Sequence, residues 1–219
     1  MTNARLIDLG SRSYREVWDL QHRVHDAVRD GSEPDTWIFV EHTPVITLGR
    51  QAKRENVFLS EEELALRGVD LVAVERGGDV TYHGPGQLVV YPIRRMERFR
   101  EVVPLVRSLE AAVINVCARF GVSAHRWSAH SGVWSGREQI CAIGLAVRRM
   151  VSMHGIALNV STALDYDRLI VPCGLSERGI TSLSAQTGRA VSLAEAKPIL
   201  LDELAREFDL EFVSVKAAA

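Results

Sequence analysis

A glycine-rich run at 76–87 lies between two apolar segments and limits how this part of the chain can fold. It reads Arg-Gly-Gly-Asp-Val-Thr-Tyr-His-Gly-Pro-Gly-Gln. The segments 71–74 and 88–91 on either side are short and apolar, as is typical of buried strands. The glycines let the backbone approach a ligand closely, and Pro85 restricts the turn. The pattern predicts a rigid loop that faces a ligand and connects two strands.

The same run does not match the glycine-rich loops that bind nucleotides. A phosphate-binding loop ends in Gly-Lys followed by Ser or Thr, and a dinucleotide-binding loop opens directly into a helix. Here the run leads into the apolar, strand-like segment 88–91 instead. Neither nucleotide-binding motif is indicated.

Composition favours an ordinary globular protein. The chain has 219 residues, 47% of them hydrophobic and 25% charged, with a net charge of -2. These values argue against a disordered chain and against a general nucleic-acid-binding protein. No apolar run approaches the roughly 20 residues of a membrane span, and the first residues lack the apolar core of a signal peptide. We therefore expect one domain over 1–219, located in the cytoplasm, without a membrane or nucleic-acid partner.

The spacing of apolar residues predicts both helices and strands. Amphipathic spacing and capping signals predict helices over 11–29, 61–67, 101–120 and 192–208. Short apolar runs predict strands over 37–40, 45–48, 133–134, 140–147 and 156–160. A turn containing Pro44 separates the strands 37–40 and 45–48. This order favours an α/β fold, with a mixed α+β sheet and helices, over a regular doubly wound sheet.

Three cysteines occur without a close pair, which argues against both a disulfide framework and a zinc site. Cys117 lies on the apolar face of a predicted helix and Cys141 in a predicted strand, so both are expected in the core. Cys173 lies between Pro172 and Gly174, an arrangement that suits a nucleophilic thiolate. A small buried hydrophobic role fits the same residue, and local sequence leaves both interpretations open.

Two histidines lie in motifs rich in glycine and apolar residues. His83 belongs to the run 76–87, and His154 begins His-Gly-Ile-Ala-Leu-Asn. Either side chain could orient a substrate or exchange a proton, and either could be a hydrogen-bonded structural residue. The arginines at 148, 149 and 178 are candidate contacts for an acidic partner or plain surface charges.

Taken together, several motifs resemble the lipoyl(octanoyl) transferase family over nearly the whole chain. The motifs are Glu-His-Thr-Pro-Val-Ile-Thr-Leu-Gly-Arg at 41–50, the run 76–87, Ala-Ile-Gly at 142–144, His-Gly-Ile-Ala-Leu-Asn at 154–159 and Pro-Cys-Gly at 172–174. The resemblance implies the fold of the lipoate and biotin protein ligase catalytic domain. It also implies that Cys173 carries an acyl thioester. The residues that it places in the acyl-binding site are Arg76, Gly77, Gly78, Asp79, Val80, Thr81, Tyr82, His83, Ala142, Ile143, Gly144, Gly155, Ile156 and Ala157.

The reaction implied by the resemblance has two halves. Cys173 takes an octanoyl group from octanoyl-acyl carrier protein, and then passes it to a lysine of a lipoyl domain. Lipoyl domains of 2-oxoacid dehydrogenases and the glycine cleavage H protein are the implied acceptors. The family's reaction uses no metal, no ATP and no other cofactor.

Gln139 departs from the family's pattern. The family pairs its cysteine with a lysine at this position, three residues before Ala-Ile-Gly. A free thiol has a pKa of about 8.5 and needs a positive neighbour to be mostly thiolate near neutrality. The amide of Gln139 can donate a hydrogen bond but carries no charge and exchanges no proton. An introduced substitution, a variant compensated by Arg137, His83 or His154, and a chain of impaired activity all remain open.

Other functional classes compete with acyl transfer. An ATP-dependent lipoate or biotin ligase would need an adenylate-binding lysine, and the chain has only Lys53, Lys197 and Lys216. A non-catalytic module that binds lipoyl domains or acyl carrier protein is a second alternative. A cysteine hydrolase built on Cys173 and a histidine is a third, but it explains fewer of the motifs.

Overall fold

The computed structural model describes residues 2–128, 130–170 and 179–215. Its largest feature is an eight-stranded sheet in the order β11-β1-β2-β6-β10-β9-β8-β7. The strands are β1 (Thr2–Arg12), β2 (Thr36–His42), β6 (Gln87–Ile93), β7 (His125–Trp127), β8 (His130–Ser135), β9 (Glu138–Arg148), β10 (Val151–Asn159) and β11 (Leu210–Ser214). Strand β1 pairs in parallel with β2 and β11, and the remaining neighbours are antiparallel. The mixed α/β fold expected from the sequence is confirmed.

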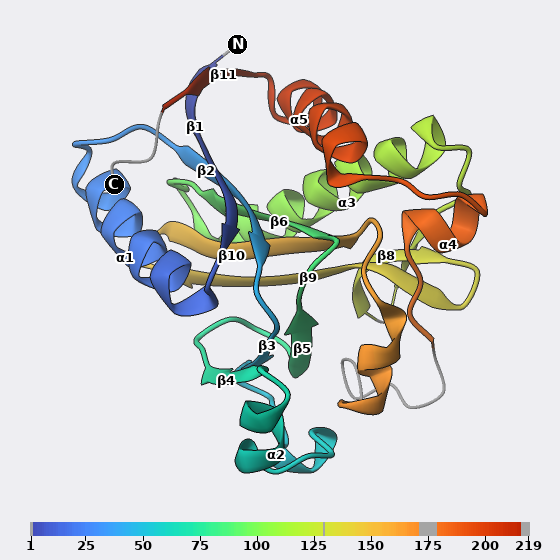
Figure 1. Ribbon diagram of the computed structural model, residues 1–219. Coiled ribbons are helices and arrows are strands. Elements are labelled where there is room, and N and C mark those ends of the chain that lie inside the picture. Colours follow the sequence, from blue (N-terminus) through green and yellow to red (C-terminus); the bar gives the residue numbers. More distant parts are fainter. Residues whose placement is uncertain (1, 129, 171–178, 216–219) are drawn as a thin grey trace.

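A second, three-stranded sheet forms a small lobe on one side of the main body (Figure 1). It consists of β4 (Asp70–Ala73), β3 (Val45–Leu48) and β5 (Val80–His83), with β3 in the centre. The lobe also carries the short helix α2 (Glu61–Leu66), which begins at the capping box of Ser60 and Glu63. Strands β2 and β3 follow each other in the chain but belong to different sheets, so they do not form a hairpin.

Helices cover both faces of the main sheet. Helix α1 (Tyr14–Asp30) lies on one face, whereas α3 (Val102–Arg119) and α5 (Leu193–Phe208) lie on the other (Figure 1). The short helix α4 (Leu183–Thr187) precedes α5, and 3-10 turns occur at Arg54–Asn56, Phe99–Glu101 and Leu164–Arg168. Helix α1 begins after the capping box of Ser13 and Glu16 and ends at Gly31, whose φ of 79° is left-handed.

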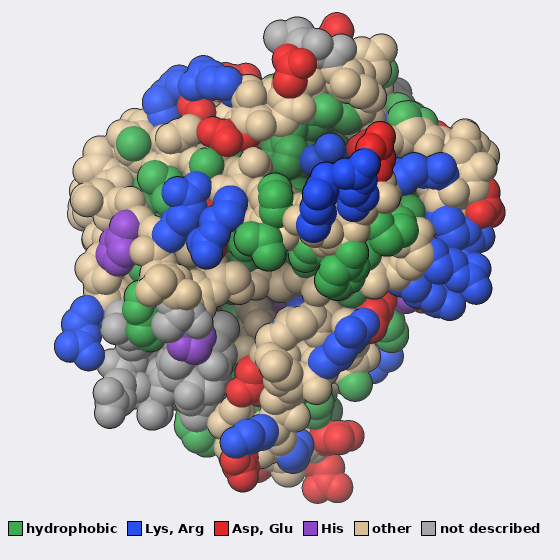
Figure 2. Space-filling view, turned by 180° about the vertical axis from the view of Figure 1, so that it is seen from behind, with side chains coloured by type: hydrophobic (Ala, Val, Ile, Leu, Met, Phe, Trp, Pro, Cys, Tyr) green, Lys and Arg blue, Asp and Glu red, His purple; other side chains and the backbone are tan. Residues whose placement is uncertain are grey.

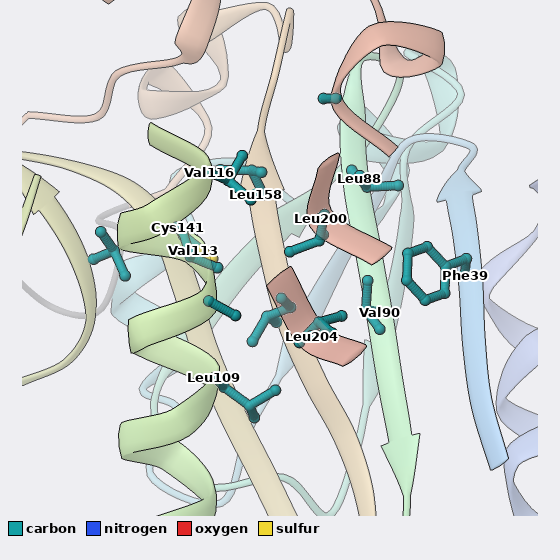
Figure 3. Packing of buried hydrophobic residues seen from close by; sticks show 14 of the residues in the cluster. Phe39, Leu88, Val90, Leu109, Val113, Val116, Cys141, Leu158, Leu200 and Leu204 are labelled. Carbon is teal, nitrogen blue, oxygen red and sulfur yellow. The ribbon is translucent and has the colours of Figure 1, made fainter. Parts of the chain in front are cut away.

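Alternate residues of the central strands supply the two cores. In β6, Leu88 and Val90 pack toward α3 and α5, while Val89, Tyr91 and Ile93 pack toward α1. Figure 3 shows the first of these cores, with Leu109 and Val113 of α3 and Leu200 and Leu204 of α5 packed around the sheet residues. A sheet buried on both faces explains why its strands read as continuous apolar runs in the sequence.

Most predicted elements are confirmed, and three differences have clear physical reasons. The run 76–87 is not entirely loop, because 80–83 form β5 and pair with β3. The helix predicted from 11 begins at 14, because 11 and 12 extend β1 beside β2. Strands β1, β7 and β11 and helix α4 were not predicted. Their lengths or mixed patterns give weak local signals, and pairing with neighbours fixes their structure.

No described helix is both long enough and apolar enough to cross a membrane.

Candidate active site

Small residues on β9 and β10 hollow out the α1 side of the main sheet. Ala142 pairs directly with Ala157, and Gly144 pairs directly with Gly155. Directly paired residues of antiparallel strands point to the same face of a sheet, so four adjacent positions carry at most a methyl group. A cavity of about 390 Å³ lies there.

The cavity brings together nearly all of the residues expected to bind the acyl group. Every one of them lines it except Val80 and Tyr82. These two line a smaller hollow of about 20 Å³, and that hollow shares Thr81, Ala142 and Ala157 with the main cavity. The structure thus places the expected residues around two adjoining spaces.

Several cavity-lining residues were not among those expected. They are Tyr14, Gln51, Val89, Tyr91, His130 and Ser131; His154 also lines the cavity and was a candidate to orient a substrate or exchange a proton. The apolar spacing of α1 and β6 had assigned Tyr14 and Tyr91 to packing, and both are indeed buried. The sequence indicated His154, because it lies directly before Gly155 in the motif 154–159. The others lie in no motif that marks them for a site.

Hydrogen bonds hold the segment 76–79 against the cavity. The Arg76 guanidinium donates to the backbone oxygen and the hydroxyl of Thr47, each at 2.8 Å. The Gly77 N–H donates to the Leu145 oxygen on β9 at 2.9 Å. The Asp79 carboxylate accepts from the backbone N–H groups of Lys53 at 3.1 Å and Val80 at 2.8 Å. Arg76 therefore joins the small lobe to the site, and Asp79 acts as a turn-stabilising group.

A cluster of buried aromatic side chains forms one wall of the cavity. Tyr14, His83, Tyr91 and His154 line the cavity, and His42 contacts Tyr14 and His83 without lining it. The Tyr14 and His83 rings stack with centroids 5.9 Å apart, and the His42 and His83 rings meet edge to face at 5.8 Å. Burial raises the pKa of Tyr14 and of Tyr91, and lowers the pKa of His42 to about 4. The wall is therefore uncharged near neutral pH.

His154 has an unusual backbone conformation for a residue within a strand. Its φ is 58°, and its backbone N–H donates to the side-chain oxygen Oε1 of Gln21 on α1 at 2.9 Å. Its Nδ1 lies 3.3 Å from the Tyr14 hydroxyl, and its Nε2 lies 3.4 Å from Glu75 Oε1. Burial raises the pKa of Glu75, but the interactions with His154, with the Glu75 backbone N–H and with His22 together lower that pKa to about 2. His154 thereby ties α1 and Glu75 to the cavity wall.

His83 takes part in a chain of side-chain amides. Its Nδ1 lies 2.7 Å from Gln87 Oε1, and Gln87 Nε2 donates to Asn159 Oδ1 at 2.9 Å. Asn159 Nδ2 in turn donates to the Thr181 backbone oxygen at 3.0 Å. The chain runs from the main cavity to the neighbourhood of the smaller hollow, because Asn159 lines that hollow.

Gln139 is buried at the beginning of β9 and lines the smaller hollow. Its backbone N–H donates to the Gly179 backbone oxygen, and its backbone oxygen accepts from the Thr181 backbone N–H, both at 3.0 Å. Ile170 lines the same hollow. Ile170 and Gly179 are the described residues on either side of 171–178, so the described chain stops and resumes beside Gln139. Cys173 itself, the expected nucleophile, lies outside the described residues.

The other two cysteines behave as core residues, as expected from the sequence. Cys117 and Cys141 are free thiols with no exposed surface. Burial raises the pKa of Cys117 to about 12 and also raises that of Cys141. Neither is a nucleophile in this environment.

Arg148 and Arg149 lie exposed near the turn that connects β9 and β10. Their assignment as contacts for a carrier protein stays a prediction, and Arg178 lies outside the described residues.

Comparison with known proteins identifies the family. Residues 13–205 match the model of the lipoyl protein ligase A/B catalytic domain. The chain belongs to this family. Its relatives within the lipoyl protein ligase A/B family include an octanoyltransferase of Chloroflexus aggregans, 42% identical over 98% of this chain and 99% of the relative. Another, from Bacteroides fragilis, is 46% identical over 87% of this chain and 91% of the relative. The chain is accordingly an acyltransferase.

Solved structures of lipoate and biotin protein ligases share the fold. A lipoate-protein ligase A bound with ATP superposes with a TM-score of 0.84 at 18% identity, covering 100% of this chain and 90% of the other. A biotin protein ligase from Aquifex aeolicus gives a TM-score of 0.55 at 12% identity, covering 95% and 70%. The ligase-like catalytic fold implied by the sequence motifs is confirmed.

Proposed function

We propose that the chain transfers an octanoyl group from octanoyl-acyl carrier protein to a lysine of lipoyl domains, in lipoate biosynthesis. The observation that carries the proposal is the cavity of about 390 Å³ on the β9–β10 strand pair, lined by the residues of the octanoyltransferase motifs. Its volume lies in the range of small-ligand pockets, and its floor of alanine and glycine suits an unbranched acyl chain. The acceptors are the lipoyl domains of 2-oxoacid dehydrogenases and the glycine cleavage H protein.

The proposed reaction is a two-step acyl transfer through Cys173. In the first half the thiolate attacks the carrier thioester, and in the second the acceptor lysine attacks the enzyme thioester. The positions of Ile170 and Gly179 beside Gln139 support the proposal that Cys173 acts next to Gln139. Gln139 provides a hydrogen-bond donor but no positive charge, so less of the thiol is ionised than with a lysine at this position. We therefore expect the first half of the reaction, in which the acyl-enzyme forms, to be slow.

An ATP-dependent ligase reaction fits the described residues less well. The two lysines among them are Lys53 and Lys197, which lie 3.8 Å from Glu55 and 2.9 Å from Asp8 respectively. Neither lines the cavity. Similarity to the ATP-bound ligase is at 18% identity and therefore reflects the fold alone. We propose a cofactor-independent transfer in the cytoplasm by a single catalytic domain.

Intact mass spectrometry tests the first half of the reaction. The chain is incubated with octanoyl-acyl carrier protein, beside the variants Gln139→Lys and Cys173→Ser. We expect one octanoyl adduct on the Gln139→Lys variant, a slower adduct on the unaltered chain and none on Cys173→Ser. The proposed function is wrong if Gln139→Lys acquires no adduct.

The second half of the reaction separates an enzyme from a binding module. A lipoyl domain is added to the adduct, and its mass is followed together with free octanoate. Appearance of an octanoyl-lipoyl domain supports transfer. Binding of the carrier or the lipoyl domain without transfer, even with Gln139→Lys, supports a non-catalytic module, and release of octanoate supports a hydrolase.

A further inference from the structure

The buried histidines near the cavity differ in their hydrogen bonding. His42 Nδ1 lies 3.2 Å from the Arg12 oxygen, and its Nε2 lies 2.8 Å from the Tyr91 hydroxyl. His154 Nδ1 lies 3.3 Å from the Tyr14 hydroxyl, and its Nε2 is buried 3.4 Å from Glu75 Oε1 without a hydrogen-bond partner among the described residues. His83 has a partner for Nδ1 alone among the described residues, and its side chain lines the main cavity. Its Nε2 is therefore available to a bound molecule.

Backbone carbonyl groups fix which nitrogen of His83 carries the proton. The Thr181 oxygen accepts only, so the atom of Asn159 facing it must be the amide nitrogen, and Asn159 Oδ1 accepts from Gln87. Gln87 Nε2 faces Asn159 Oδ1 and, at 3.3 Å, the Tyr82 backbone oxygen. Gln87 Oε1 must therefore accept from His83 Nδ1. In the neutral ring the proton lies on Nδ1, and Nε2 carries the lone pair.

The surroundings keep this imidazole neutral. Burial, followed by the nearby His42, lowers the pKa of His83 to about 3, and Gln87 opposes the shift only in part. Charged or titratable groups near it are Arg76 on the loop, His42 on β2, His154 on β10 and Tyr14 on α1. No carboxylate contacts His83 among the described residues, so the ring is a weak but permanently available proton acceptor.

We propose that His83 Nε2 is the proton acceptor for the acceptor amine in the second half of the reaction, an inference that rests on the proposed function. The neutral amine nitrogen bonds to the acyl carbon, and the carbon–sulfur bond breaks. Nε2 takes the proton that this nitrogen loses, and the imidazolium returns a proton to the departing thiolate. Thioester and amine become amide and thiol, and the ring ends neutral. This assigns to His83 a proton transfer that Gln139 is unable to perform.

Nitrogen-15 NMR of the free protein tests the tautomer without any need for turnover. We expect the His83 ring at pH 7 to be neutral with the proton on Nδ1. The variant Gln87→Glu replaces the neutral acceptor with a carboxylate of the same length and should raise the pKa of His83. A proton on Nε2 in the unaltered chain, or an imidazolium at pH 7, would overturn the proposal.

Transfer from the isolated octanoyl-enzyme to a lipoyl domain tests the chemistry. His83→Gln should lower the transfer rate about 10²-fold or more, the usual scale for a lost general base. His125→Gln, at an exposed position on β7, is the matched control and should transfer normally. The rate of Gln87→Glu relative to the unaltered chain should fall as pH decreases, because its imidazole becomes protonated. A merely structural His83 would leave that ratio independent of pH.

The two proposals fail in different ways. If no octanoyl adduct forms even with Gln139→Lys, the proposed function fails and the role of His83 fails with it. If the adduct forms and His83→Gln passes it to the lipoyl domain at an undiminished rate, only the role of His83 fails. A ratio of the Gln87→Glu transfer rate to that of the unaltered chain that does not change with pH would also refute only the role of His83.

Discussion

Gly144 and Gly155 lie directly opposite each other on β9 and β10, and neither position has free space for a side chain. A Cβ on Gly155 would overlap the Val90 backbone oxygen, and one on Gly144 would lie 3.2 Å from both Arg76 Cδ and the Gly77 oxygen. The lack of side chains therefore allows β6 to lie close to Gly155 and the segment 76–77 to lie close to Gly144. Both glycines line the cavity, so this close approach shapes its wall.

We expect Gly155→Ala to destabilise the fold. The overlap is with backbone, so β6 and β10 would have to separate, at about 1–3 kcal/mol of unfolding free energy. Urea unfolding at pH 7 measures the difference. Gly77→Ala is the matched control, because its Cβ would meet only the Leu145 oxygen at 3.5 Å, an ordinary contact. Equal unfolding free energies for the two variants would contradict this account of Gly155.

We expect Ala142→Leu to shorten the acyl chain that the enzyme accepts. The larger side chain would fill part of the cavity without adding a polar group, so an octanoyl chain would lose space while a butyryl chain would still fit. Adduct formation from carrier proteins loaded with each acyl group measures this preference, ideally in the Gln139→Lys background. The ratio of octanoyl to butyryl adduct should fall about tenfold or more. An unchanged ratio would place the acyl chain elsewhere.

We expect the fold to lose stability as pH falls from about 6.5 toward 4. The pKa of His42 is about 4 and that of His83 about 3 in the folded chain, against 6.5 when exposed. The unfolded chain therefore binds protons in this range that the folded chain does not, and each such histidine contributes up to about 1.4 kcal/mol per pH unit. Urea unfolding between pH 7.5 and 4.5 gives the slope. His42→Gln should reduce the slope by about one proton, and an unchanged slope would show that His42 protonates in the folded state.

Glu75, whose pKa is about 2, affects stability in a lower pH range than the histidines do. Its contribution to stability is present above its ordinary pKa of 4.5 and is lost as pH falls from there toward 2. Losses above pH 5 are therefore assigned to the histidines and not to Glu75.

We expect Glu110→Ala to loosen β7 and β8, which carry Arg126 and Gly132. The buried Glu110 carboxylate accepts from Arg107 at 2.7 Å, from Arg126 at 3.0 Å and from the Gly132 N–H at 3.2 Å. Its loss leaves a buried N–H unpaired and should lower the unfolding free energy by about 2–4 kcal/mol. Glu110→Gln, which can still accept from Gly132, should lose less. The order of the two variants in urea unfolding checks the assignment, and a larger loss for glutamine would contradict it.

The sequence predicted the elements whose signals are local. The helices containing Val113 and Leu200 show apolar spacing at the helical period, and both form as expected. The capping box of Ser60 and Glu63 marked the start of a helix to the residue. Strand β5 was missed, because glycines flank it and its residues look like a loop until β3 is paired with them.

The sequence predicted the motifs of the site but not the other residues that form the walls of the cavity. The small residues of 142–144 and 155–157 appear in the sequence as short motifs, and the structure places both at the cavity. Tyr14 and Tyr91 have the same apolar spacing as neighbours that only pack. Their position at the cavity follows from how α1 lies across the sheet, which is a property of the tertiary structure. The hydrogen-bond chain of Gln87 and Asn159 likewise depends on strand pairing and carries no local signal.

The parallel pairing of β1 with β11 sets an order of events during synthesis. Thr2 of β1 pairs with Leu210, so β1 meets its outer neighbour only after all the residues between the two strands have been made. Until then β1 has a free edge of backbone N–H and C=O groups. Long sequence separation slows such pairing, so a nascent chain passes through a stage with an open sheet edge. We expect the edge to stay open for a time set by the rate of translation.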